Sequence, residues 1–162
     1  MYNMWLIFDT MQRRELCMIY LDSITNVNAL EYDEVWIIVR KLKESDLIEG
    51  SKHIPELSPS TYLLERYIEL REKGIWNKES FEKIYVPSFI REIRARIGVK
   101  EILNDLVYMS GIGQKICLVC YCEDEEICHR SIVSGILAGM GANIQSNSDY
   151  LRFYDMYINE FL

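Results

Sequence analysis

The apolar positions of this chain form short continuous runs that alternate with longer amphipathic stretches. The runs cover residues 5–8, 17–21, 35–40 and 114–122. Run 35–40 is rich in β-branched and aromatic residues, and run 114–122 follows a glycine-flanked turn. Both features predict buried strands. The first two runs fit a strand or a buried helix equally well, because a short apolar run has no diagnostic period.

The stretches between these runs carry apolar residues at helical spacing. They predict helices over residues 58–74, 77–98, 100–111, 128–140 and 149–162. Pro59 suits the first turn of the first helix, with Ser58 or Ser60 as its cap. Pro87 is expected to break or kink the second helix.

Two segments connect these elements differently. Residues 41–59 are polar and contain Gly50 and two prolines, so they predict a long surface loop. Residues 142–145 predict a short strand. Helices that alternate with buried strands indicate an α/β fold, and we expect a compact Rossmann-like three-layer sandwich with a mainly parallel sheet. The length of 162 residues corresponds to a single domain spanning residues 1–162.

Composition narrows the classes of protein. Hydrophobic residues make up 49% of the chain and aromatic residues 12%, which argues against disorder. The net charge of -7 opposes binding to nucleic-acid phosphate, so a nucleic-acid partner is not expected. The apolar runs are too short to span a membrane, and the first ten residues lack the basic region of a signal peptide. We therefore expect a cytoplasmic protein whose five cysteines are reduced thiols.

Candidate chemistry is concentrated in residues 120–135, where a strand, an acidic loop and a helix follow one another. Ligands of α/β proteins bind at the carboxyl ends of strands, facing helix N-termini. Cys128, His129 and Arg130 fall in the first turn, where backbone N–H groups and an arginine fork favour an anion. We expect the ligand-binding residues to be Arg130, Cys120, Arg40 and Ser131.

Cys128 and His129 are the candidate catalytic residues. A thiol at a helix N-terminus beside arginine and histidine has a lowered pKa, whereas the four acids at 123–126 oppose the thiolate. The favoured interpretation of these acids is a solvated helix start, where they interact with the helix dipole. His129 fits a general acid/base and a packed histidine bonded to a backbone carbonyl equally well.

A metal centre is the alternative use of these cysteines. Cys120 and Cys122 point the same way from a strand, and Cys117 points the other way, into the core. The spacing Cys-x-Cys-x5-Cys-His departs from the usual zinc knuckles, and adjacent side chains at a helix start diverge. We therefore expect no metal and no cofactor.

The segment LVCYCEDEEICHRSIVSGIL resembles the signature of the domain of unknown function 488 family, which includes YeaO-like proteins. Cys120, Cys128, His129 and Arg130 match the signature in type and spacing. Weaker similarity in ELSPSTYLLERY and WNKESFEKIY, and at Arg40, extends the resemblance over residues 35–144. Two features depart from the family pattern. Cys122 stands where the family usually has a glutamate, and the family's glycine-histidine-serine turn is not evident near the N-terminus.

Two functions remain open on this evidence. The leading hypothesis is a protein that binds, with or without transforming, a small anionic ligand such as a nucleotide or phosphate ester. A thiol-dependent transferase or hydrolase would be its enzymatic form. The rival is a non-catalytic acidic module, an inhibitor or adaptor that docks on a protein partner through Tyr150, Tyr154 and Tyr157. The oligomeric state is not predicted.

Overall fold

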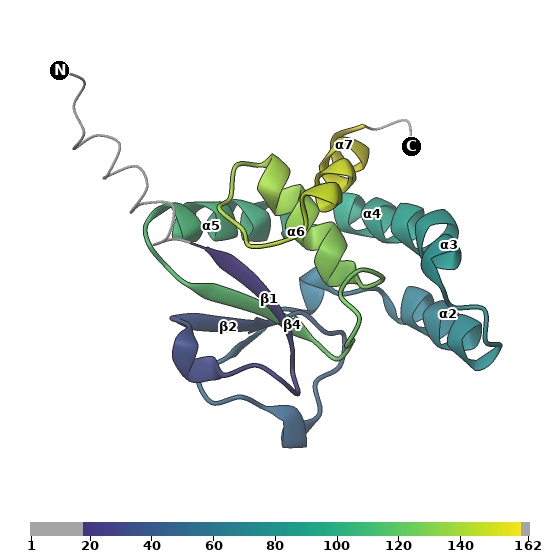
Figure 1. Cartoon of the computed structure of the whole chain (residues 1–162), viewed down its shortest axis with the longest axis horizontal. Helices are drawn as coiled ribbons and strands as arrows, with labels where there is room; N and C mark the ends of the chain where they lie inside the picture. Colours follow the sequence, from purple (N-terminus) through teal and green to yellow (C-terminus); the bar gives the residue numbers. More distant parts are fainter. Residues whose placement is uncertain (1–17, 160–162) are drawn as a thin grey trace.

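The computed structural model describes residues 18–159, which form an α/β fold around one sheet (Figure 1). Four parallel strands pair in the order β1-β4-β2-β3 and are flanked by helices. The strands are β1 (Ile19–Ser23), β2 (Glu34–Ile37), β3 (Lys52–His53) and β4 (Ile116–Cys120). This arrangement confirms the predicted fold class.

The centre of the sheet is apolar on both faces. All five residues of β4 are at most 1% exposed, and β4 pairs with β1 along its whole length. On its other side β4 pairs with β2, whose Val35, Trp36 and Ile37 are also buried. A parallel strand covered on both faces reads as a continuous apolar run, which explains why the pattern located these strands.

In the view of Figure 1, the labelled helices of the described chain lie above the sheet and to its right. They are α2 (Thr61–Glu72), α3 (Lys78–Ser80), α4 (Val86–Ala95), α5 (Val99–Gly111), α6 (His129–Gly139) and α7 (Arg152–Ile158). Helices α4, α6 and α7 contact one another, and α5 contacts α4 and α6. Shorter 3-10 turns are η1 (Ala29–Glu31), η2 (Glu44–Asp46), η3 (Pro55–Leu57) and η5 (Ser148–Leu151), and η4 (Phe81–Tyr85) is a π-helix.

Of the two outcomes predicted at Pro87, a break or a kink, the break does not occur. Helical backbone continues from α3 through η4 into α4, and the N–H of Val86 bonds to the carbonyl of Phe81, five residues earlier. The π-turn ends directly before Pro87, so the hydrogen-bond pattern is widened where the proline has no N–H to donate. The chain therefore accommodates the proline by a local widening of the helix.

The segment 41–59 is more ordered than the loop that its polarity predicts. It contains η2, β3 and η3, and β3 pairs with β2 through Trp36–Lys52 and Ile37–His53. The pattern misses β3 because it is a two-residue edge strand with exposed side chains. At the other edge, the strand expected over 142–145 is reduced to a single bridge between Ile144 and Ile19. The apolar run 5–8 lies outside the described residues.

Close packing joins α6 to the C-terminal segment. A Cβ added at Gly135 would lie 1.9 Å from the carbonyl oxygen of Tyr150, and one at Gly139 would lie 2.0 Å from the Tyr154 ring. Tyr150 is 4% exposed, and Tyr154 and Tyr157 are half-buried against the core. This tyrosine stripe is therefore mainly core packing.

Within residues 18–159, the helices are all too short or too polar to cross a lipid bilayer.

Candidate functional site

The candidate site is a cavity of about 580 Å³ at the carboxyl ends of β2 and β4. Its wall combines thiols, aromatic rings and charged groups. The lining residues are Val39, Arg40, Lys41, Pro59, Leu64, Tyr67, Arg71, Trp76, Tyr85, Cys120, Tyr121, Cys122, Glu123, Asp124, Ile127, Cys128 and His129. A crevice at the ends of parallel strands is the usual ligand position in an open α/β sheet.

Cys128 is the N-cap residue of α6, and its thiol faces other reactive groups. Its backbone is extended, with φ -130° and ψ 150°, and its side chain makes no capping hydrogen bond. The Sγ atom lies 3.3 Å from Cys120 Sγ and 3.6 Å from His129 Nδ1. The predicted divergence of Cys128 and His129 is therefore wrong, because a cap residue does not follow the helical 100° rotation.

His129 is held in one orientation by its second ring nitrogen. Nε2 lies 2.7 Å from the carbonyl oxygen of Ile38, which can only accept, so Nε2 carries the proton of this bond. The ring packs at 5.7 Å from the Phe89 ring and is 6% exposed. Nδ1 then faces the Cys128 thiol with its lone pair. His129 thus has the backbone contact of a packed histidine together with a contact to the thiol.

The pKa of the cysteine at the helix cap and the pKa values of the strand cysteines shift in opposite directions. Burial opposes the Cys128 thiolate, but hydrogen bonds from Cys120 and Cys122 and the charge of His129 hold its pKa well below the ordinary value. Hydrogen bonds with Cys122 and Cys128, together with burial, hold the pKa of Cys120 well above it. Burial raises the pKa of Cys117, on the other face of β4, to about 12. Of these three thiols, Cys128 is therefore the one that loses its proton most readily.

Arg130 is buried beside these sulfurs, at 2% exposure. Its Nη2 donates to the carbonyl oxygen of Cys122 at 2.6 Å, and its Nε has no hydrogen-bond partner among the described residues. Burial disfavours the guanidinium charge, yet the nearby Cys128 and Cys120 sulfurs raise the pKa of Arg130 above its ordinary value. Arg130 is absent from the described residues that line the cavity, and the Cys128 sulfur is the largest influence that favours its charge.

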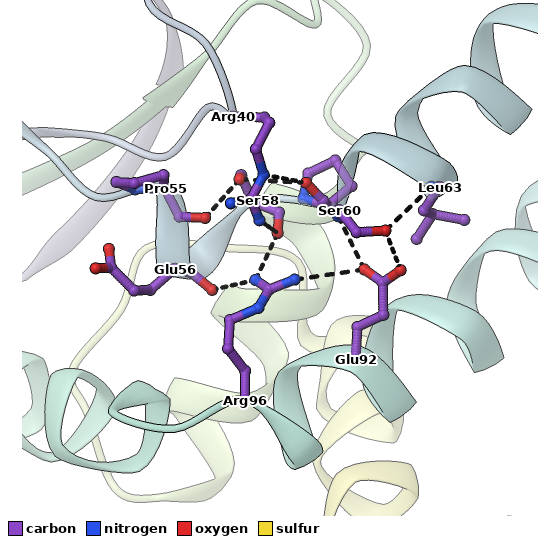
Figure 2. Close-up of polar contacts among 9 residues, drawn as sticks. Arg40, Pro55, Glu56, Ser58, Ser60, Leu63, Glu92 and Arg96 are labelled. Atoms are coloured by element: carbon purple, nitrogen blue, oxygen red, sulfur yellow. Dashed lines mark hydrogen bonds and ion pairs between the residues drawn. The ribbon is translucent and has the colours of Figure 1, made fainter.

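Arg40 lines the cavity and anchors the start of α2 (Figure 2). Its Nε donates to the carbonyl oxygen of Pro59 at 2.9 Å, and its Nη2 to that of Ser58 at 3.4 Å. Arg96 donates to the Ser58 carbonyl from the opposite side, at 2.8 Å. Two cations thus fix the turn that precedes α2.

Ser60 completes this anchor and caps α2 (Figure 2). Its Oγ accepts from the N–H of Leu63 at 3.1 Å and donates to Glu92, whose other oxygen accepts from the Ser60 N–H at 2.9 Å. Of the two serines considered as caps, Ser60 is therefore the one that caps the helix. The anchored turn sets the position of the α2 residues that line the cavity.

The remaining residues of the Cys-His-Arg segment have structural contacts. Ser131 is fully buried, and its Oγ donates to the Cys128 carbonyl at 2.8 Å, which places it away from the described lining of the cavity. In the acidic loop, Glu125 accepts from the Tyr150 hydroxyl at 2.9 Å, while Glu123 and Asp124 line the cavity. The loop is thus tied to the C-terminal segment at one point and borders the site at another.

Sequence reasoning missed the aromatic wall of the cavity. Tyr67 and Trp76 meet edge to face at 4.7 Å, and Trp76 meets Tyr85 at 5.6 Å. Arg71 stands over the Tyr67 ring at 5.5 Å. The spacing of Tyr67 and Arg71 by one helical turn was a signal for this wall, but it also fits an ordinary amphipathic helix.

Three donor atoms in the site belong to types that bind metals. The ligand atoms of Cys120, Cys128 and His129 all lie within 4.8 Å of one another. Two thiolates on one tetrahedral zinc ion would lie about 3.8 Å apart, since each Zn–S bond is about 2.3 Å. The observed sulfur separation is 3.3 Å, and the buried Arg130 cation disfavours a dication beside it. In this arrangement the two sulfurs are therefore closer together than two thiolates on one zinc ion.

Comparison with known proteins supports the resemblance described above. A family model described as "DUF488-N3a: Active DUF488-N3 subclade" matches residues 21–141, which includes most of β1 as well as the Cys-His-Arg segment. Curated proteins and solved structures yielded no match. Because the family model covers well over half of the sequence, the chain belongs to the DUF488 family.

Proposed function

We propose that the cavity binds a small anionic ligand, such as a nucleotide or phosphate ester, and that Cys128 attacks this ligand as a nucleophile. One observation carries the proposal. Cys128 Sγ lies in the cavity wall, 3.6 Å from His129 Nδ1, while His129 Nε2 is held by the Ile38 carbonyl. A nucleophile, a base and a group that orients the base are the parts that activate a thiol.

Activation of the thiol follows from the tautomer of His129. With its proton on Nε2, the neutral ring accepts the Cys128 proton at Nδ1 and leaves a thiolate–imidazolium pair. The thiolate then forms a bond to the electrophilic atom of the ligand. The leaving group departs with the proton that the imidazolium returns, so that protons balance over the step.

Arg130 is assigned a positioning role in this mechanism. Its buried charge compensates the Cys128 thiolate, and its bond to the Cys122 carbonyl fixes the end of the strand. A cation that neutralises the nucleophile between turnovers lowers the cost of keeping a thiolate out of water. From the sequence, Arg130 is expected to bind the anion of the ligand. In this proposal the cations of the cavity wall bind it instead.

The charged rim of the cavity supports a ligand with both an anionic group and hydrogen-bond donors. Arg40, Lys41 and Arg71 line the cavity, and so do Glu123 and Asp124. A phosphate suits the three cations, whereas sugar hydroxyls or a base amino group suit the carboxylates. A nucleotide combines these groups in one molecule.

The aromatic wall supports a planar ring in the same ligand. Tyr67, Trp76 and Tyr85 contact one another edge to face and line the cavity together. Stacking on an aromatic side chain contributes about 1–3 kcal/mol per base and accepts any base. We therefore expect a nucleotide to bind more tightly than phosphate alone.

Alkylation of Cys128 tests this proposal. The rate of reaction with iodoacetamide would be followed over pH by peptide mass spectrometry, with inorganic phosphate or adenosine 5′-monophosphate added. We expect a midpoint below the value of about 8.5 for a free thiol, because the folded pKa is lowered. Both additives should slow the reaction, and the nucleotide should act at the lower concentration. Cys117 is the internal control, since its pKa of about 12 predicts no reaction near neutral pH.

A matched variant distinguishes the contribution of the base to binding from that of the phosphate. Trp76→Leu should remove the advantage of the nucleotide over phosphate while leaving the alkylation midpoint of Cys128 unchanged. A midpoint at or above that of a free thiol, together with no protection by either additive, would overturn the proposal. The non-catalytic docking module would then be the better account of this acidic protein.

A further inference from the structure

The nucleophile has a second thiol beside it that the proposed reaction does not use. Cys120 Sγ lies 3.3 Å from Cys128 Sγ, and both cysteines line the cavity. Cys120 ends β4 and Cys128 caps α6, so two rigid elements hold the pair in place. The described cysteines are all free thiols. The pair is therefore present as a dithiol.

We propose that Cys128 and Cys120 form a reversible dithiol–disulfide couple that reduces small disulfides entering the cavity, with Cys128 as the attacking thiol and Cys120 as the resolving thiol. The inference rests on the proposed function only in taking Cys128 as the nucleophile. It assigns a second chemical class of substrate, low-molecular-weight disulfides, to the same cavity.

The two thiols differ in the way that this chemistry needs. The pKa of Cys128 is lowered, so it attacks as a thiolate, whereas the pKa of Cys120 is raised, so it stays protonated until a mixed disulfide forms. Cys120 is 1% exposed and lines the cavity beside Cys128. It is therefore shielded from bulk reagents but lies within contact distance of the sulfur that it must attack.

The exchange balances in two steps. The Cys128 thiolate attacks one sulfur of the substrate disulfide, the substrate S–S bond breaks, and the first thiolate leaves with the proton of the His129 imidazolium. Neutral His129 then accepts the Cys120 proton as Cys120 attacks Cys128 Sγ. The second substrate thiolate leaves and takes up that proton. One substrate disulfide is reduced to two thiols, and the protein dithiol is oxidised to one disulfide.

The local contacts favour Cys120 over Cys122 as the resolving thiol. The N–H of Cys122 donates to Cys120 Sγ at 3.4 Å, which stabilises negative charge on that sulfur as its proton leaves. Cys122 lies beyond the end of β4, and its carbonyl is bound by Arg130 at 2.6 Å. The Cys122 thiol also hydrogen bonds to Cys128, so the choice of Cys120 rests on the 3.3 Å between the two sulfurs and on the support from the Cys122 N–H.

The experiment uses the full-length reduced protein and 2-hydroxyethyl disulfide, a small uncharged probe. After excess probe is removed, intact mass and peptide mapping would identify the products. We expect the wild type to lose two hydrogen atoms and to yield a Cys120–Cys128 cross-linked peptide, which dithiothreitol reverses. Cys120→Ser should instead accumulate one mercaptoethanol adduct at Cys128. Cys117→Ser is the matched control, because Cys117 lies on the other face of β4, and it should form the cross-link as the wild type does.

The wild-type peptide map keeps the test valid if the buried Cys120→Ser variant fails to fold. A stable mixed disulfide at Cys128 in the wild type, or a Cys122–Cys128 cross-link, would overturn the couple. If Cys128 nevertheless shows its low alkylation midpoint, only the couple fails and the proposed function stands. If Cys128 does not react with iodoacetamide or with the disulfide, both proposals fail.

Discussion

Replacing Arg130 by methionine tests whether its buried charge is paired with the Cys128 thiolate. Methionine keeps much of the length of the side chain but removes the charge and the donor to the Cys122 carbonyl. Arg130 is 2% exposed, so water does not replace what is lost. Removing one partner of a buried ion pair costs about 3–5 kcal/mol, because the other charge stays buried without compensation.

The size of the pairing is measured by comparing this substitution in two backgrounds. In Cys128→Ser the negative partner is absent, so Arg130→Met loses only the hydrogen bond and is expected to cost about 2 kcal/mol less. Urea unfolding at pH 8, followed by tryptophan fluorescence, gives the four free energies of the cycle. Arg96→Met is the matched control. Arg96 also donates to backbone carbonyls, but these belong to Glu56 and Ser58 and not to the loop beside Cys128. Its cost should be the same in both backgrounds.

The pH dependence has a definite sign. The folded pKa of Cys128 lies below its unfolded value, so the folded state binds fewer protons. The stabilisation is therefore fully present above the unfolded pKa of about 8.5 and declines as the pH falls through the folded pKa. The cost of Arg130→Met should shrink over the same range. Equal costs in both backgrounds at every pH would show that Arg130 acts only through the Cys122 carbonyl.

Two further outcomes are expected. Gly139→Ala should lower the free energy of unfolding by about 1–3 kcal/mol in urea titrations, because its Cβ would meet the Tyr154 ring at 2.0 Å. Gly111→Ala, with nothing within 4 Å of the added Cβ, should be neutral or slightly stabilising, and equal losses at both sites would contradict the packing argument. Elemental analysis of the purified protein should give no stoichiometric zinc or iron, and stoichiometric metal that is lost in Cys120→Ser would contradict a site built for thiol chemistry.

The parts of the fold that the sequence predicts are those in which burial dominates. Strands β2 and β4 are apolar on both faces, and α6 buries nearly its whole length, so each leaves a clear pattern. Strand β3 leaves no such pattern, since Lys52 and His53 are exposed at the sheet edge. Pairing with β2 fixes β3, and no property of its own two residues indicates that partner.

The site shows the same division between local and long-range information. The Cys-His-Arg segment is local, so its place at a helix start after a strand could be predicted. The role of Arg130 could not, because its burial depends on the packing of the loop that contains Cys122. Likewise, the contact of Arg40 with Pro59 joins residues that are 19 positions apart. A sequence pattern identifies such side chains as candidates but does not show which of them reach the ligand.

The convergence of Cys128 and His129 has a simple cause in the geometry of the helix cap. Helical residues rotate by about 100° each, so two neighbours inside a helix point apart. Cys128 is not inside the helix, and its extended backbone turns its side chain independently of that rotation. Serine or aspartate at this position would bond to the first-turn amides, whereas the Cys128 thiol makes no such capping bond and instead faces Cys120 and His129. A cysteine at the cap therefore lacks a stabilising hydrogen bond of about 1 kcal/mol and instead places its sulfur between a strand end and a histidine.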